Sequence, residues 1–139
     1  MSVIVTDQGF GPDTWPEATL PIEALDAEPA LKAAALDLPG DLEPEVLEGR
    51  LDNVTHIRIS FPSFADGRGF TLGRQLRRMG FAGRLRARGP VIADQYTMAR
   101  RAGFDEVEIP DALAARQCEG DWLARSLWDA PGYQSILKG

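Results

Sequence analysis

The sequence predicts an α/β domain, with about four consecutive βα units forming a parallel sheet. From about residue 33, short apolar runs alternate with helix-length amphipathic runs, as expected of strands joined by crossover helices. The chain has 139 residues, 44% of them apolar, which is enough to bury one core without disulfides or metals. We therefore expect a single domain over residues 1–139, made of an irregular N-terminal arm (1–30), a βα core (31–118) and a C-terminal helix and tail (119–139).

The N-terminal arm is interrupted by four prolines, Pro12, Pro16, Pro21 and Pro29. Because the residue before a proline avoids helical backbone angles, local structure in the arm is expected to be short and broken. One short strand is predicted at Val3–Val5. We expect Trp15 to pack onto the main body of the domain.

Four short runs in the core predict strands, at residues 34–38, 55–61, 84–87 and 105–109. Such strands can form an open, three-layered sheet or a partial (βα) barrel, and the sequence does not choose between them. In both architectures ligands meet the loops that follow the strands. These loops are residues 37–41, 61–69, 86–89 and 108–111.

Apolar spacing predicts the helices between the strands. Leu72, Leu76 and Met79 share one helical face, and Gly80 is a stop signal. Pro90 suits the first position of a second helix, which Gly103 would end. On that helix a shared face is predicted for Val91, Gln95, Met98 and Ala102.

Two further helices are expected near the C-terminus. One begins near Pro110 and runs towards Arg116. The other is a short amphipathic helix that carries Trp122 and Trp128 and could either cap the sheet or meet a partner. If these two tryptophans are exposed, they are candidate contacts between copies of a homo-oligomer.

Charge is distributed unevenly along the chain. The net charge is −6, but residues 68–101 contain nine arginines and one acid, so that segment is +8 and the remainder is −14. The overall acidity argues against nucleic-acid binding. We interpret Arg74, Arg77, Arg78, Arg100 and Arg101 as solvated outer faces of helices, paired with acids elsewhere.

The sequence indicates a cytoplasmic protein without a metal site or cofactor. It contains no apolar run long enough to cross a bilayer, and its N-terminus lacks the features of a secretory signal. Cys118 and His56 are the only residues of their types, so neither a disulfide nor a cysteine or histidine metal site can be assembled from this chain alone. No flavin, haem or iron–sulfur motif is recognisable.

The loop Phe61–Gly69 could bind a small anion. Gly67 and Gly69 flank Arg68 where a helix begins, and backbone N–H groups there can point at a ligand such as sulfate, sulfite, phosphate or a carboxylate. Alternatively, the glycines only permit a tight turn, Asp66 caps the helix and the phenylalanines pack in the core.

A second basic feature is the alternation of Arg84, Arg86 and Arg88, which share one face of a predicted strand. Either one of them points into a polar pocket, or the strand lies at an edge and its arginines face solvent or acids. We predict a pocket at the strand ends formed by Asp66, Arg68, Arg88, Asp94 and Gln95. The full set of candidate anion-binding residues is Asp66, Gly67, Arg68, Gly69, Arg86, Arg88, Asp94 and Gln95.

Several motifs occur together in a fixed order. They are Phe61–Phe70, Leu76-Arg77, Gly83–Gly89, Asp94-Gln95, Arg101–Asp105 and Tyr133-Gln134. Through these motifs, residues 20 to 135 resemble the bacterial family catalogued as domain of unknown function 934. Members are typically encoded beside assimilatory sulfite reductase and phosphoadenylylsulfate reductase, and are described as oxidoreductases of sulfite reduction. The resemblance transfers no catalytic residue.

The chain departs from the family at two positions. Pro90 stands where the family usually has aspartate, and Ala102 where it usually has cysteine, which argues against thiol redox chemistry. The resemblance implies an accessory protein of sulfate and sulfite reduction that acts with sulfite reductase. The alternatives are an enzyme or oxidoreductase that binds a small sulfur oxyanion in the strand-end pocket, and a structural homo-oligomer.

Overall fold

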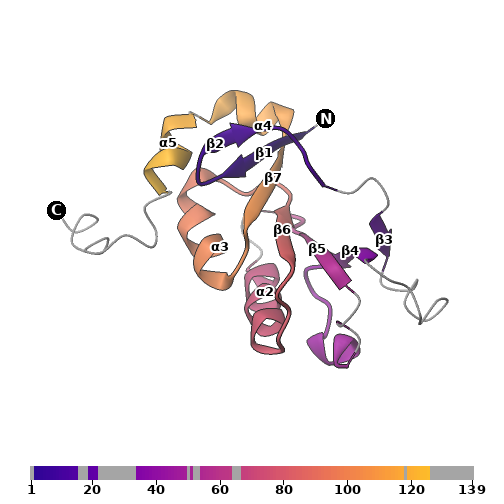
Figure 1. Ribbon diagram of the computed structural model, residues 1–139. Helices are drawn as coiled ribbons and strands as arrows, with labels where there is room; N and C mark the ends of the chain where they lie inside the picture. The colour runs from indigo at the N-terminus through magenta and orange to yellow at the C-terminus, as the bar shows by residue number, and fades with distance from the viewer. Residues whose placement is uncertain are drawn as a thin grey trace.

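The computed structural model describes residues 2–15, 19–21, 34–49, 51, 54–63, 67–117 and 119–125. Within these residues an open, mostly parallel sheet runs through the molecule in the order β2-β1-β7-β6-β5-β4-β3 (Figure 1). Strands β3 to β7 are parallel, while β1 is antiparallel to both β7 and β2. The strands are β1 (Ser2–Thr6), β2 (Gly9–Gly11), β3 (Thr19–Pro21), β4 (Ala34–Pro39), β5 (Val54–Ser60), β6 (Arg84–Arg88) and β7 (Glu106–Pro110). The sheet does not close, so the open architecture is the correct one of the two predicted.

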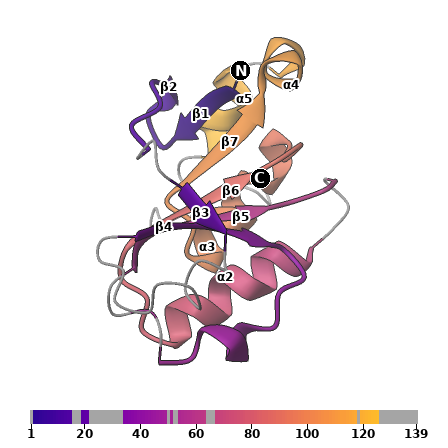
Figure 2. The ribbon, with the colours of Figure 1, turned by 90° about the vertical axis from the view of Figure 1, so that its right-hand side faces the viewer.

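Helices α2 and α3 cover one face of this sheet, and Figure 2 shows α2 lying along it beside β4 and β5. Two short helices, α4 and α5, pack at the end of the sheet that holds β7, β1 and β2. The helical elements are α2 (Arg68–Arg78), α3 (Tyr96–Ala102), α4 (Asp111–Arg116) and α5 (Glu119–Ala124), with 3-10 turns η1 (Pro44–Leu47) and η2 (Ala93–Gln95).

The main core lies between the sheet and helices α2 and α3. Since side chains alternate along a strand, one side of each central strand can be wholly apolar. That side is buried against Leu72 and Leu76 of α2 and Ala99 of α3. It consists of Leu36, Leu38, Ile57, Ile59, Leu85, Ala87, Val107 and Ile109.

The four predicted core strands are confirmed, with ends that differ by at most one residue. Two predicted glycine stops are also confirmed. Gly80 follows α2 with φ 101°, and Gly103 caps α3 with φ 106°, backbone angles that favour glycine.

The second predicted helix begins later than expected. After a tight bend in which Val91 N–H donates to the Gly89 carbonyl at 2.8 Å, Ile92 is extended, so the chain turns helical only at η2 and α3. The predicted apolar face is therefore wrong at Met98, which is 50% exposed. Tyr96 and Ala99 face the core instead.

The helix that carries Trp122 packs against the sheet, which is one of its two predicted roles, so this tryptophan is not exposed. Its side chain is fully buried, and its ring meets the edge of Tyr96 with centroids 6.0 Å apart. Glu119 at the start of α5 accepts a 2.9 Å hydrogen bond from Phe10 N–H of β2, which holds the helix against the sheet. Burial removes Trp122 as a contact between copies, while Trp128 lies outside the described residues.

The N-terminal arm is more regular than predicted. The strand expected at Val3–Val5 is β1, and it forms a hairpin with β2 that the sequence analysis did not predict. Gly9, with φ 96°, supplies the backbone conformation that this turn needs. Trp15 is buried on the main body, as expected.

The two glycines of the Phe61–Gly69 loop give the first testable prediction. A Cβ on Gly69 would collide with the Phe61 ring, whereas a Cβ on Gly67 would meet nothing within 4 Å. Overpacking should outweigh the better helix propensity of alanine, so Gly69→Ala should lower the free energy of unfolding by about 1–2 kcal/mol. Chemical denaturation measures this, with Gly67→Ala as the matched control. Equal stability of the two variants would contradict the packing argument.

Candidate functional site

Charged side chains occupy the face of the sheet opposite α2 and α3. Strand register aligns one row of them across four neighbouring strands: Asp37 of β4, Arg58 of β5, Arg86 of β6 and Glu106 of β7. The two acids stand at the ends of this row and the two arginines stand between them, so each arginine has an acid beside it on the neighbouring strand. Arg86, one of the two inner residues of the row, is fully buried.

Each nitrogen of the Arg86 guanidinium meets a carboxylate. Nε donates to Glu106 at 2.7 Å, Nη1 donates to Glu108 at 2.8 Å, and Nη2 donates to Asp13 at 3.0 Å. Nη2 also pairs with Glu106. Burial alone would lower the pKa of Arg86, but these hydrogen bonds and charges outweigh it and raise the pKa above its ordinary value.

Glu108 connects three arginines. It accepts hydrogen bonds from Arg86 and, at 3.3 Å, from Nη1 of Arg58, and it pairs at 3.3 Å with Nε of Arg88. Arg58 also forms a two-pronged ion pair with Asp37, at 2.5 and 2.8 Å. The hydrogen bond that Arg58 donates to Asp37 is the main reason that the pKa of Arg58 is raised.

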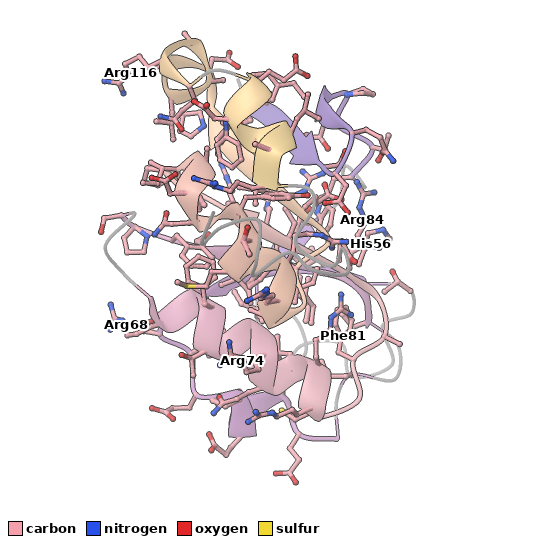
Figure 3. All side chains as sticks on the ribbon, turned by 90° about the vertical axis from the view of Figure 1, so that its left-hand side faces the viewer. His56, Arg68, Arg74, Phe81, Arg84 and Arg116 are labelled. Atoms are coloured by element: carbon pink, nitrogen blue, oxygen red, sulfur yellow. The ribbon has the colours of Figure 1, made fainter. Side chains whose placement is uncertain are left out.

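Residues 13–15 of the arm cover part of this charged face. The Trp15 ring lies 4.5 Å from the guanidinium carbon of Arg86 and 5.4 Å from that of Arg84. It also meets the His56 ring edge-on, with centroids 4.9 Å apart. Figure 3 shows His56 and Arg84 lying together, away from the arginines of α2.

Contacts among the described residues do not assemble the predicted strand-end pocket, and of the wider set of candidate residues only Arg86 and Arg88 meet. Arg86 and Arg88 meet at Glu108 on the charged sheet face. Arg68 instead starts α2 on the other face, is exposed, and lies 3.9 Å from Asp41. Asp94 pairs with Arg125 at 2.8 Å, while Gln95 accepts from Ile92 N–H. Arg68 lies on the apolar side of the sheet, because α2 packs there, whereas Arg86 and Arg88 lie on the charged side.

The loop glycines have packing partners. Gly69 lies against the Phe61 ring, whereas Gly67 is exposed at the helix start and its backbone φ is −86°. Asp66, another candidate in this loop, and Cys118 lie outside the described residues. The alternative explanation, a turn packed on phenylalanines, accounts for Gly69.

β6 is the central strand of the order and not an edge strand. The predicted explanation of an edge strand is therefore wrong about the position of the strand. It is correct that the arginines of the strand pair with acids. Sequence reasoning missed Glu106 and Glu108 as their partners. The available signal was the period-two spacing of acids in residues 105–109, which matches that of the arginines, although pairing them requires the strand register.

A different basic surface lies on the helices. Within the described residues, α2 and α3 carry no aspartate or glutamate but carry six arginines, Arg68, Arg74, Arg77, Arg78, Arg100 and Arg101. Arg77 and Arg100 are engaged with backbone carbonyls and with Asp105 or Asp7. Arg74, Arg78 and Arg101 are exposed, and Figure 3 shows Arg74 projecting from α2.

Two polar grooves flank these surfaces. One, of about 310 Å³, runs between η1 and α2 and is lined by Asp41, Glu43 and Arg68 among others. The other, of about 280 Å³, lies beside Asp94, Asp121 and Arg125. In the described ranges no group of three histidine, cysteine or acidic side chains could hold a metal ion. None of the helices described there has the length and apolar character needed to span a membrane.

A family model described as a bacterial protein of unknown function, DUF934, matches residues 35–128 of the chain. This range contains β4 from its second residue and all of β5 to β7 and α2 to α5, and hence most of the charged sheet face. No curated protein and no solved structure matches the chain significantly.

The buried guanidinium predicts a large stability effect. Arg86→Ala should leave Glu106 and Glu108 buried with less compensation, lowering the free energy of unfolding by roughly 3–5 kcal/mol. Arg116→Ala, at an exposed position on α4, is the control and should change it by less than about 0.5 kcal/mol. Urea denaturation measures both, and a small effect at Arg86 would show that its partners relax into solvent.

His56 should titrate below the ordinary histidine pKa of 6.5, first because burial disfavours its charged form and then because Arg84 is close. Glu106 opposes this shift only in part. Since the folded pKa lies below the unfolded one, stability from this group is complete above about pH 6.5 and declines as pH falls towards the folded pKa.

His56 is the only histidine, so a proton NMR titration of its ring assigns the pKa directly. Replacing the neighbouring cation in Arg84→Gln should raise that pKa. A value at or above 6.5 in the unmutated protein would refute the prediction.

Proposed function

The chain belongs to the DUF934 family of bacterial proteins of unknown function, and we propose that it is an accessory protein of assimilatory sulfite reduction that docks on sulfite reductase. The observation that carries the docking role is the exposed basic surface formed by Arg74, Arg78 and Arg101 on α2 and α3. The pathway comes from the family resemblance and not from the geometry. The protein acts in this proposal by binding and not by chemistry of its own.

The helical surface suits an acidic partner. Two adjacent helices without a single acid concentrate positive charge in a chain whose net charge is −6. Exposed arginines can steer an acidic surface into contact and then form forked hydrogen bonds with its carboxylates. Met98, half exposed on α3, adds apolar surface beside Arg101.

The charged sheet face suits docking less well. Its arginines Arg58 and Arg86 already hold carboxylates of the same chain, and Trp15 covers part of it. Exchanging these partners for those of another protein would require breaking a buried network, which is costly. Arg74, Arg78 and Arg101 are exposed, so a partner can reach them without breaking this network.

The homo-oligomeric alternative has lost one of its two candidate contacts. Trp122 is buried beneath α5 against Tyr96, so it offers no surface to a second copy. The oxyanion-binding alternative retains Arg88, whose side chain is half exposed on the charged sheet face.

Charge reversal tests the docking surface. The triple variant Arg74→Glu, Arg78→Glu and Arg101→Glu should reduce affinity for sulfite reductase holoenzyme by at least about tenfold, chiefly through slower association. Raising ionic strength should weaken binding of the unmutated chain in the same manner. Biolayer interferometry with purified reductase measures both effects.

The matched control is Arg116→Glu, which changes an exposed arginine on α4, far from α2 in Figure 3. It should leave the affinity unchanged. If the unmutated chain does not bind the reductase, the proposed function is wrong. If Arg116→Glu weakens binding as much as the triple variant does, the attraction is not specific to α2 and α3.

A further inference from the structure

Arg88 is the least engaged arginine of the charged sheet face. Its side chain is 49% exposed, whereas Glu108 beside it is 6% exposed. The contact between them is made by Nε of Arg88, at 3.3 Å from Glu108. Within the described residues the terminal nitrogens Nη1 and Nη2 of Arg88 have no other hydrogen-bond or ion-pair partner.

This arrangement leaves one edge of the guanidinium outside the pair with Glu108. The group is planar, so a contact at Nε does not occupy the Nη1–Nη2 edge. That edge carries parallel N–H donors that match two oxygens of one anion. The carboxylate that anchors Arg88 is also shared with Arg58 and Arg86, so its negative charge is compensated from two further sides.

Ser60 adds a neutral donor on the same face. It is the register partner of Arg88 on β5, and neighbouring strands lie about 4.8 Å apart. Its hydroxyl has no hydrogen-bond partner among the described residues. Both residues end central strands of an open parallel sheet, which is where such sheets bind ligands.

We propose that Arg88 and Ser60 form a binding site for a small oxyanion, in which two ligand oxygens accept from the Nη1–Nη2 edge and the Ser60 hydroxyl donates to the same ligand. Carboxylates and tetrahedral or pyramidal oxyanions share this chemistry. The site lies on the face of the sheet opposite α2 and α3, so it does not depend on the proposed docking function.

NMR titration of the full chain tests the site, with sodium sulfate, sulfite, phosphate and acetate as probes at constant ionic strength. At least one probe should cause saturable shifts at the Arg88 Nε–H and at the amides of Ser60 and Gly89. The ranking of the four probes distinguishes carboxylates from sulfur and phosphorus oxyanions. No saturable shift with any of them would overturn the proposal.

Variants locate the binding. Arg88→Ala should lower the affinity for the best probe by about tenfold or more, the usual contribution of a charged hydrogen-bonded group. Arg88→Lys, which keeps a cation beside Glu108 but lacks the forked edge, should still fold and should also bind more weakly. Ser60→Ala should bind more weakly than the unmutated chain.

Arg116→Ala is the control for general attraction to exposed arginines and should bind as the unmutated chain does. An equal loss in that variant would overturn the proposal, as would unchanged binding in both Arg88 variants. Binding of Arg88→Ala to sulfite reductase should be unaffected. The experiments can therefore refute the oxyanion site without refuting the docking surface, and the reverse.

Discussion

The burial of the Arg86 guanidinium is the constraint on which much of this structure depends. A cation in the middle of a sheet is stable only if carboxylates replace the water that it loses. Those carboxylates come from β7 and from residue 13 of the arm. The charged group therefore ties together the pairing of β6 with β7, their register, and the path of the chain before β3.

Register connects this constraint to the apolar core. Residues 84–88 alternate between arginine and apolar side chains, so a shift of one residue would turn Arg86 towards α2 and Leu85 towards the charged face. Both changes would be unfavourable at once. The two faces of β6 thus specify the same register independently, one through hydrophobic burial and the other through ion pairing.

The sequence predicted the apolar face of the sheet more completely than the charged face. The strands and the glycine stops followed from local patterns that the structure keeps, and the alternation of Arg84, Arg86 and Arg88 correctly placed them on one face. Their partners were not predictable, because Glu106 and Glu108 meet them only after β7 pairs with β6. Likewise, the helical spacing after Pro90 could not reveal that the bend at Gly89 delays the start of the helix. The apolar stripe that contains Trp122 does not show whether a neighbouring element covers that stripe.

The fold also shows how the positive charge of residues 68–101 is distributed in space. Its excess of eight positive charges does not form one surface, because its nine arginines divide between the two faces of the sheet. Those on β6 are compensated mainly by acids of β7 and the arm, while Arg77 and Arg100 hold the turn around residues 103–105 against the helices. Positive charge available to a partner is thus concentrated on the outer side of α2 and α3. On the charged sheet face, Arg88 is the most exposed of the arginines. A small surface of each kind is sufficient for binding. An arginine whose nitrogens all meet carboxylates, as those of Arg86 do, cannot recognise another anion without leaving those carboxylates uncompensated.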